Sequence, residues 1–288
     1  VNPDGYYYNE LTNPGGGGMW RKNRRNSGGG NYGVDLNRNW GYEWGYDESG
    51  SSSSPSAETY RGTAAFSEPE TQAMRDFHLA RDFQVSVYYH SYSNLVLYPW
   101  GYDYFLTPDD DIFSAAADSM AAHNGYAPGP AHGLYPANGV TDDWIYGEQT
   151  LKDKTFAFTI EVGGSSDGFW PSPSRIPALV SENLEPNRYL ARLAGNPYAL
   201  RAPAAPVVAV ADTVDSTYYA VFWTHDDTLN PAVAYELMEL QDFQRVLDSA
   251  NDWQHFTNNQ FSITSTRRNS DPTSFYSGQG NNHVRWFQ

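Results

Sequence analysis

Two segments that each end in a reactive residue place the strongest constraint on how this chain folds. Residues 83–90 (FQVSVYYH) end at His90, and residues 156–162 (FAFTIEV) carry Glu161 next to their end. Aromatic and β-branched residues dominate both segments, which predicts two β-strands. Open α/β sheets bind their ligands just beyond the carboxyl ends of their strands. A His and a Glu delivered to that edge therefore indicate a metal-assisted hydrolase.

The charge and the cysteine content exclude several classes of function. The 288 residues include 34 Asp and Glu against 18 Lys and Arg, a formal net charge of -16. Such a chain repels phosphate backbones, so we expect no nucleic-acid partner. No apolar run is long enough to span a bilayer. Cysteine is absent, which excludes disulfides and thiolate metal sites. This acidic, Tyr-rich and Gly-rich composition is typical of exported proteins, so we expect secretion.

Predicted strands alternate with predicted helices over the first two thirds of the chain, which favours an α/β domain. The chain opens with what looks like a tight turn at residues 1–5, in a Gly-rich stretch. Helical spacing of apolar residues predicts one helix beginning at Ser67 and three more over residues 112–123, 141–146 and 176–193.

Specific residues are expected to begin, end or bend these helices. Ser67-x-x-Glu70 matches a capping box at the start of the first. Thr141 or Asp142 is expected to cap the third. Pro186 is expected to kink the fourth, because proline removes a helical hydrogen bond.

The character of the chain changes at Asn196. Residues 201–206 (RAPAAP) form a stiff linker, and short alternating apolar runs follow, including residues 207–211, 218–223 and 261–266. We therefore predict a catalytic domain over residues 1–195, a linker over 196–206 and an all-β sandwich module over 207–288. Aromatic residues in this module such as Trp223 form either a binding face, for a surface or a glycan, or its core.

Both strand-end residues also have ordinary explanations. Most histidines at strand ends bind no metal, so His90 alone is weak support for a metal site. A carboxylate that follows apolar strand residues lies at a partly dry edge, where its pKa rises toward that of a useful base. Glu161 suits that role, and the alternative is an ion pair with a nearby Arg.

Residues 35–40 (DLNRNW), together with Arg21 and Tyr135, extend the candidate site. An Arg beside an Asn amide suits a carboxylate, so Asn37 and Arg38 are candidates for substrate binding. An internally hydrogen-bonded turn explains the same segment equally well. Arg21 suits the stabilisation of an oxyanion beside a metal. Tyr135, in a loop flanked by Gly and Pro, either caps a pocket or only packs.

Seven short motifs follow one another along the chain. They are residues 2–5 (NPDG), 20–24 (WRKNR), 34–40 (VDLNRNW), 90–93 (HSYS), 97–102 (LYPWGY), 135–144 (YPANGVTDDW) and 158–161 (FTIE). Their order resembles that of the zinc metallocarboxypeptidases of the carboxypeptidase A/B and T type, over roughly residues 1–193. The resemblance implies a three-layer α/β fold around a mixed sheet, a Zn²⁺ cofactor, and hydrolysis of the C-terminal bond of peptides and proteins.

The resemblance implies a catalytic role for three matched residues. His90 would be the third zinc ligand. Glu161 would be the general base that takes a proton from zinc-bound water and passes it to the leaving amine. Arg21 would hold the tetrahedral oxyanion together with the zinc. These three roles agree with the roles that the residue types alone indicate.

Five further residues would bind the substrate. Asn37 and Arg38 would hold the terminal carboxylate, Tyr135 would cover it, and Tyr92 would line the adjacent subsite. The resemblance implies that Asp142 would occupy the base of the side-chain pocket, where B-type enzymes pair an Asp with Lys or Arg; its alternative is the helix cap described above. The pocket is completed by Leu97, Gly101, Ala137 and Thr159. We therefore predict a preference for Lys or Arg, with some acceptance of apolar residues.

Two features depart from the family pattern. The family's other two zinc ligands come from a His-x-x-Glu motif before NPDG, and no His-x-x-Glu occurs in this sequence. We therefore expect a catalytic domain that lacks its N-terminal part and, with one zinc ligand instead of three, is inactive as it stands. After Glu161, residues 162–166 (VGGSS) replace the Arg-Asp pair of the digestive enzymes.

Two other functions remain open at this point. A non-catalytic pseudo-peptidase would keep the carboxylate clamp for binding alone, although retention of Glu161 and Arg21 argues against it. A related enzyme would act on amidated cell-wall peptides or small amides, although Asn37, Arg38 and Tyr135 favour a peptide carboxylate.

Overall fold

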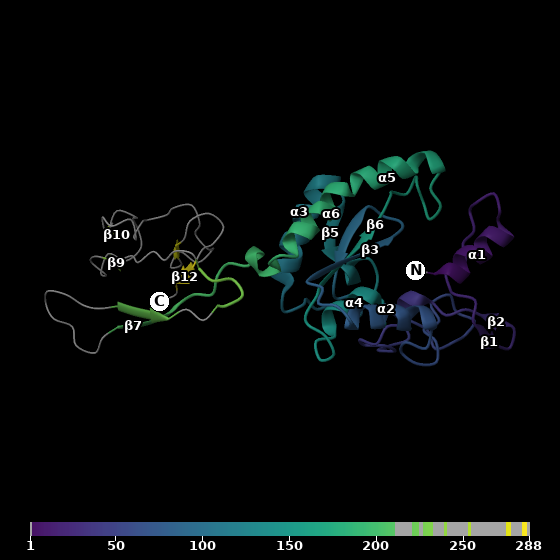
Figure 1. The fold of residues 1–288 in the computed structure, drawn as a ribbon, viewed down its shortest axis with the longest axis horizontal. Helices are drawn as coiled ribbons and strands as arrows, with labels where there is room; N and C mark the ends of the chain where they lie inside the picture. Colours follow the sequence, from purple (N-terminus) through teal and green to yellow (C-terminus); the bar gives the residue numbers. More distant parts are fainter. Residues whose placement is uncertain are drawn as a thin grey trace. The chain divides into compact units, whose positions relative to one another are not determined.

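The structure is a computed structural model that describes residues 2–210, 221–224, 227–232, 239–240, 253–254, 275–277 and 284–286 (Figure 1). The chain divides into two units, Val1–Pro197 and Tyr198–Gln288. A four-stranded mixed sheet lies at the centre of the first unit. Its order is β3 (Val85–His90), β6 (Phe156–Glu161), β4 (Leu95–Tyr98) and β5 (Ala127–Pro130). Strands β3 and β6 are parallel, β4 is antiparallel to β6, and β5 is parallel to β4.

Helices cover both faces of this sheet, which gives three layers (Figure 1). The helices on one side are α3 (Asp110–Asn124), α5 (Ile176–Glu182) and α6 (Leu184–Leu193), and those on the other are α2 (Pro69–Leu79) and α4 (Thr141–Gly147). The alternation along β6 explains the arrangement. Phe156 and Phe158 contact Phe113 of α3, whereas Ala157 packs with Trp144 of α4. This confirms the predicted α/β fold with a mixed sheet.

Strand β6 is buried along its whole length. A strand covered on both faces can be apolar throughout, and its two polar residues are exceptions that need a reason. Thr159 and Glu161 are those residues, and both lie on the face of the sheet that carries α4. The polar face of β6 therefore marks the side on which a site can form.

Two predicted helix caps are wrong. Helix α2 begins at Pro69, and the Ser67 hydroxyl donates to the Glu68 carboxylate at 2.7 Å instead of capping the helix. Helix α4 has Val140 at its N-cap position, with no side-chain cap. There the amide oxygen of Asn37 accepts from the Thr141 backbone N–H at 3.1 Å, so a neighbouring loop replaces the predicted local cap.

The helix predicted over residues 176–193 is divided in two, at Asn183 and not at Pro186. Pro186 lies in the first turn of α6, where a missing N–H costs no hydrogen bond. The helix predicted over 112–123 is confirmed as α3, which ends at Gly125 with a positive φ of 72°. That left-handed conformation is the reason for a glycine there.

The N-terminal turn predicted at residues 1–5 is instead the start of helix α1 (Pro3–Thr12). The side chain of Asn2 accepts from the Gly5 backbone N–H at 3.0 Å, and Pro3 takes the first helical position. The remaining elements of this unit are short: strands β1 (Asn26–Gly28) and β2 (Asn31–Tyr32), and 3₁₀ helices η1 (Leu36–Arg38), η2 (Ala131–Gly133) and η3 (Pro173–Arg175), with η4 (Pro197–Leu200) at the boundary.

In the second unit the described residues form antiparallel strand pairs. These are β7 (Val207–Val210) with β8 (Val221–Thr224), β9 (Glu239–Leu240) with β10 (Trp253–Gln254), and β11 (Phe275–Ser277) with β12 (Val284–Trp286). The predicted run at residues 261–266 lies outside the described residues, and the sandwich module stays a prediction. Among the described residues, no helix is long and apolar enough to cross a membrane.

Candidate active site

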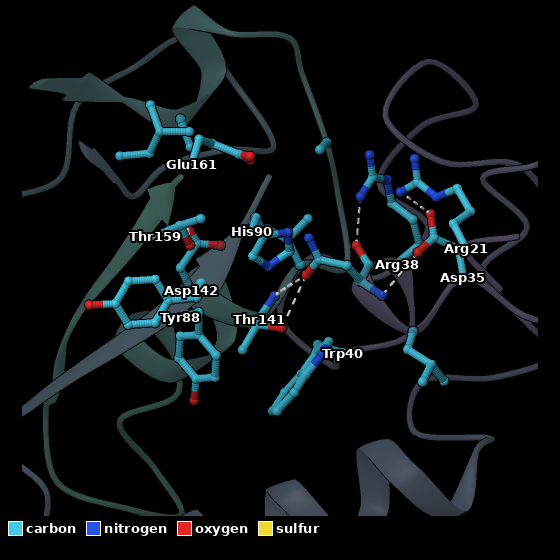
Figure 2. A pocket seen from close by; sticks show the side chains of 18 of the residues that line it. Arg21, Asp35, Arg38, Trp40, Tyr88, His90, Thr141, Asp142, Thr159 and Glu161 are labelled. Carbon is cyan, nitrogen blue, oxygen red and sulfur yellow. Dashed lines mark hydrogen bonds and ion pairs between the residues drawn. The ribbon is translucent and has the colours of Figure 1, made fainter. Parts of the chain in front are cut away.

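A cavity of about 490 Å³ opens at the carboxyl ends of β3 and β6 (Figure 2). Seven of the eight residues predicted for the site line it: Arg21, Asn37, Arg38, His90, Tyr135, Asp142 and Glu161. They come from six different segments of the chain, so the fold brings together what the sequence only suggested. The eighth, Tyr92, is not among the lining residues, but it packs edge-on against Phe169, with ring centroids 4.8 Å apart. Phe169 itself lines the cavity.

His90 and Glu161 are direct neighbours across the parallel pair of strands β3 and β6. Burial, together with the nearby Asp142, raises the pKa of Glu161 to about 7, and Arg21 opposes the shift. Burial lowers the pKa of His90 to about 4. At neutral pH His90 is therefore uncharged and carries a free ring lone pair, and Glu161 exchanges a proton readily. These are the states that a metal ligand and a general base require.

Arg21 is held in place by Asp35. The Arg21 guanidinium and the buried Asp35 carboxylate are 2.7 Å apart, while the Arg21 side chain is 44% exposed and lines the cavity. The other Asp35 oxygen accepts from the Asn37 backbone N–H at 3.1 Å and caps η1. One carboxylate thus positions both a cation and the loop beside it. From the sequence, residues 35–40 indicated at most a hydrogen-bonded turn, because an Asp cap is local but the pairing of Asp35 with Arg21 is not.

Asn37 and Arg38 are fixed by hydrogen bonds that leave donors for a ligand. The Asn37 side-chain oxygen accepts from the Thr141 backbone N–H at 3.1 Å and the Thr141 hydroxyl at 3.0 Å. The amide nitrogen of Asn37 therefore remains for another acceptor. Arg38 is buried, with Nε donating to the Gly50 carbonyl at 2.8 Å and Nη1 to the Asn37 carbonyl at 2.7 Å. Two immobilised donor groups side by side suit a carboxylate.

Asp142 and Asp143 are both buried but differ in what they do. Asp143 accepts from the backbone N–H groups of Gly101 at 2.8 Å and Tyr102 at 3.0 Å, so it holds the loop that follows β4. Asp142 faces the cavity and accepts from the Thr159 hydroxyl at 3.4 Å. Burial raises the pKa of both carboxyls, and the charge of Asp142 raises that of Asp143 further. The cavity therefore contains a desolvated carboxyl, Asp142, whose charged form is partly stabilised by backbone N–H groups of α4 and by the Thr159 hydroxyl.

The mouth of the cavity is lined by Tyr135 and Phe169, both more than half exposed. Phe169 sits on a loop that the Asp167 carboxylate ties down. Arg175 donates to Asp167 from Nε at 2.7 Å and from Nη2 at 3.2 Å, and the Gly164 backbone N–H donates to it at 3.1 Å. No sequence pattern connected these residues, because the ion pair joins a Gly-rich loop to a separate 3₁₀ helix.

The described residues do not by themselves complete a zinc site. Among them, no group of three His, Cys, Asp or Glu side chains is placed to hold a metal ion. A catalytic zinc takes three protein ligands and one water. His90 has the chemistry of such a ligand, but it supplies only one of the three protein ligands that the zinc needs.

Comparisons with known proteins place this geometry in a family. The family model described as Zinc carboxypeptidase matches residues 1–186. Carboxypeptidase B of Astacus astacus is 35% identical over 211 residues, which cover 69% of this chain and 67% of that protein. Carboxypeptidase B of Bos taurus is 37% identical over 203 residues, which cover 66% of this chain and 46% of that protein.

A solved structure shows the same relationship. The carboxypeptidase A of Helicoverpa armigera superimposes with a TM-score of 0.58 at 30% identity, over 67% of this chain and 49% of that one. The chain thus spans about half to two thirds of the length of these relatives. Zn²⁺ is the metal of the matched family. The match to the first 186 residues shows that the chain belongs to the zinc carboxypeptidase family.

Proposed function

We propose that this protein acts on the C-terminal residue of peptides and proteins, with a preference for Lys or Arg and some acceptance of apolar residues. The observation that carries the proposal is one cavity with fixed donors on one wall and a buried carboxyl on the other. Figure 2 shows Arg38 and Arg21 on the side opposite Asp142, with His90 between them. A terminal residue has its carboxylate at one end and its side chain at the other, which matches this layout.

Recognition of a chain end follows from Asn37 and Arg38. Both side chains are held by the surrounding loops, so a carboxylate meets donors that need no reorganisation. An internal peptide bond offers only a neutral carbonyl at the same place. A charge-assisted hydrogen bond is about twice as strong as a neutral one, so the pair favours chain ends.

The preference for Lys and Arg follows from Asp142. Its ionised form is disfavoured by burial, which is why its pKa is raised. A cationic side chain in the cavity would pair with it and stabilise the charged form. An apolar side chain gains no such pairing and instead contacts Leu97 and Ala137, which also line the cavity. Basic residues thus gain an interaction that apolar residues lack, whereas apolar residues are still accommodated.

Glu161 and Arg21 support hydrolysis rather than binding alone. Bound Zn²⁺ would make a water acidic enough for Glu161, whose pKa is raised to about 7, to take a proton from it and pass that proton to a leaving amine. Arg21 lines the same cavity and presents a positive charge toward which an oxyanion can form. A protein that only binds chain ends has no use for either group.

The alternative function is a non-catalytic protein that retains the carboxylate clamp. The observation in its favour is that no group of three metal-binding side chains occurs among the described residues. Under this alternative, peptides with basic ends bind to the cavity but are never shortened. Secretion, suggested by composition alone, is compatible with both functions.

Peptides that differ only in their last residue test the proposal. The full chain is incubated with added Zn²⁺ and peptides ending in Arg, Lys, Leu or Phe, and binding and release are followed by calorimetry and mass spectrometry. The proposal expects Arg and Lys ends to bind and be released fastest. Efficient release of Phe or Leu but not Lys or Arg would contradict the specificity, and binding without release would support the non-catalytic alternative.

A further inference from the structure

Tyr88 lies next to Asp142 in the cavity, although nothing in the sequence singled it out. It belongs to β3 and pairs with Thr159 of β6 in the parallel register. Thr159 in turn donates to the Asp142 carboxylate at 3.4 Å. Tyr88 lines the cavity, and Asp142 is close enough to contribute to raising its pKa, mainly an effect of burial. Figure 2 shows Tyr88 beside Asp142, across the cavity from Arg21.

The Tyr88 ring is held rigidly. Its hydroxyl is 2.6 Å from Nε2 of His78, a buried residue of α2. The ring also packs against the cluster formed by Trp40 and Trp144. Tied at its tip and packed on one side, the ring cannot swing away from a ligand. It is therefore a fixed aromatic wall next to a carboxyl.

Neither Tyr88 nor His78 carries a positive charge that would neutralise the Asp142 carboxyl. Burial lowers the pKa of His78 to about 4, so its imidazole is neutral near pH 7. The Tyr88 side chain is a phenol, which is neutral at this pH. A cation that reaches Asp142 therefore meets its carboxyl beside a neutral aromatic surface.

An aromatic ring beside a carboxyl binds the side chains of arginine and lysine with different strengths. A guanidinium is planar and weakly hydrated, so it can stack on a ring while its edge pairs with a carboxylate. An ammonium is compact and strongly hydrated, and it gains less from a ring face. We infer that Tyr88, together with Asp142, selects arginine over lysine as the C-terminal residue. The inference rests on the proposed function, because it assumes that the side chain of a terminal residue reaches Asp142.

Calorimetry with small ligands tests this without any catalytic step. N-acetyl-arginine, N-acetyl-lysine and N-acetyl-leucine are titrated into the full chain, into Tyr88→Leu, which removes the ring, and into Tyr88→Phe, which keeps the ring but loses the hydrogen bond to His78. Cation–π contacts at partly desolvated sites predict about threefold to thirtyfold tighter binding of the arginine ligand than the lysine ligand. Tyr88→Leu should abolish that ratio and Tyr88→Phe should retain it.

The outcomes separate this inference from the function on which it rests. Equal binding of the arginine and lysine ligands by the unmodified chain overturns the role of Tyr88 while leaving the basic preference intact, and this comparison needs no variant to fold. A Tyr88→Leu variant that weakens all three ligands alike also overturns it. A leucine ligand that binds as tightly as both basic ligands, or no binding of any ligand, overturns the proposed function itself.

Discussion

His90 and Glu161 occupy the same level of the sheet, as partners in the parallel register of β3 and β6. The register places Tyr88 opposite Thr159 in the same way, two residues earlier. Side chains alternate between the faces of a strand, so a slip of one residue would turn every one of these groups to the opposite face. The buried apolar residues of β6 resist such a slip. The packing of the core therefore fixes the position of His90 relative to Glu161.

Asp142 and Asp143 should respond differently to the same substitution. Asp142→Asn keeps the shape of the cavity but removes the charge, so ligands with Arg or Lys ends should bind about tenfold to a hundredfold less tightly, as expected for a lost charge-assisted hydrogen bond. Ligands with a Leu end should bind as before. Isothermal titration calorimetry with the matched ligands measures both effects.

The control for this substitution is its neighbour. Asp143→Asn leaves one of two backbone N–H groups, of Gly101 or Tyr102, without an acceptor. It should lower the free energy of unfolding by ~1–3 kcal/mol, the cost of a buried unsatisfied donor. If Asp142→Asn lost stability and kept its preference for basic ends, the assignment of Asp142 to the pocket would be wrong.

His78 should make the stability of the first unit depend on pH. Its pKa is about 4 in the folded state against an ordinary 6.5, because burial disfavours the charged imidazole. Between these values the unfolded chain binds a proton that the folded chain does not. Stability is therefore complete above pH 6.5 and falls as the pH drops toward 4. The loss from this group is on the order of 3 kcal/mol, at 1.36 kcal/mol per pKa unit.

Comparison with His78→Gln isolates this contribution from the titration of carboxylates. The variant lacks the imidazole, so its free energy of unfolding, measured by urea titration at several pH values, should fall less steeply between pH 6.5 and 4 than that of the unmodified chain. Parallel curves for the two proteins would show that His78 is not the responsible group.

Arg175 should control the order of the loop that carries Phe169. Arg175→Gln removes the paired hydrogen bonds to Asp167, which then holds the loop only through the Gly164 backbone. Amide hydrogen exchange at residues 163–170 should become faster, while exchange in β6 should not change. Arg188→Gln is the matched control, since Arg188 forms an exposed ion pair with Glu185 on α6. Equal effects of the two substitutions would exclude a specific role for the Asp167 pair.

Local sequence patterns were enough to predict the strands that end at His90 and Glu161. A run of aromatic and β-branched residues is a local signal, and it indicates a strand whatever its neighbours are. Helix α3 was predictable for the same reason, because its acidic start and its Gly125 stop are local. The mixed sheet followed only from the resemblance to a family, since alternation alone does not give strand directions.

The unpredicted features depend on side-chain contacts between different elements of the fold. The bond from Thr141 to Asn37, the pair of Arg175 with Asp167 and the Tyr88–His78 contact have no signature in one sequence. Helix α1 was missed for a different reason. Asn and Pro begin turns and helices alike, so residues 2–5 do not distinguish the two.

One binding experiment tests the central claim, that a single cavity recognises both the terminal carboxylate and a basic side chain. Four peptides that end in Arg or Leu, each as a free acid or as an amide, are titrated into the full chain and into Arg38→Gln. We predict that the peptide that ends in Arg with a free carboxylate binds tightest to the unmodified chain. Amidation of this peptide and replacement of its last residue by Leu should each weaken binding. In Arg38→Gln, free acids and amides should bind equally well. Equal affinity for acids and amides in the unmodified chain would contradict the central claim.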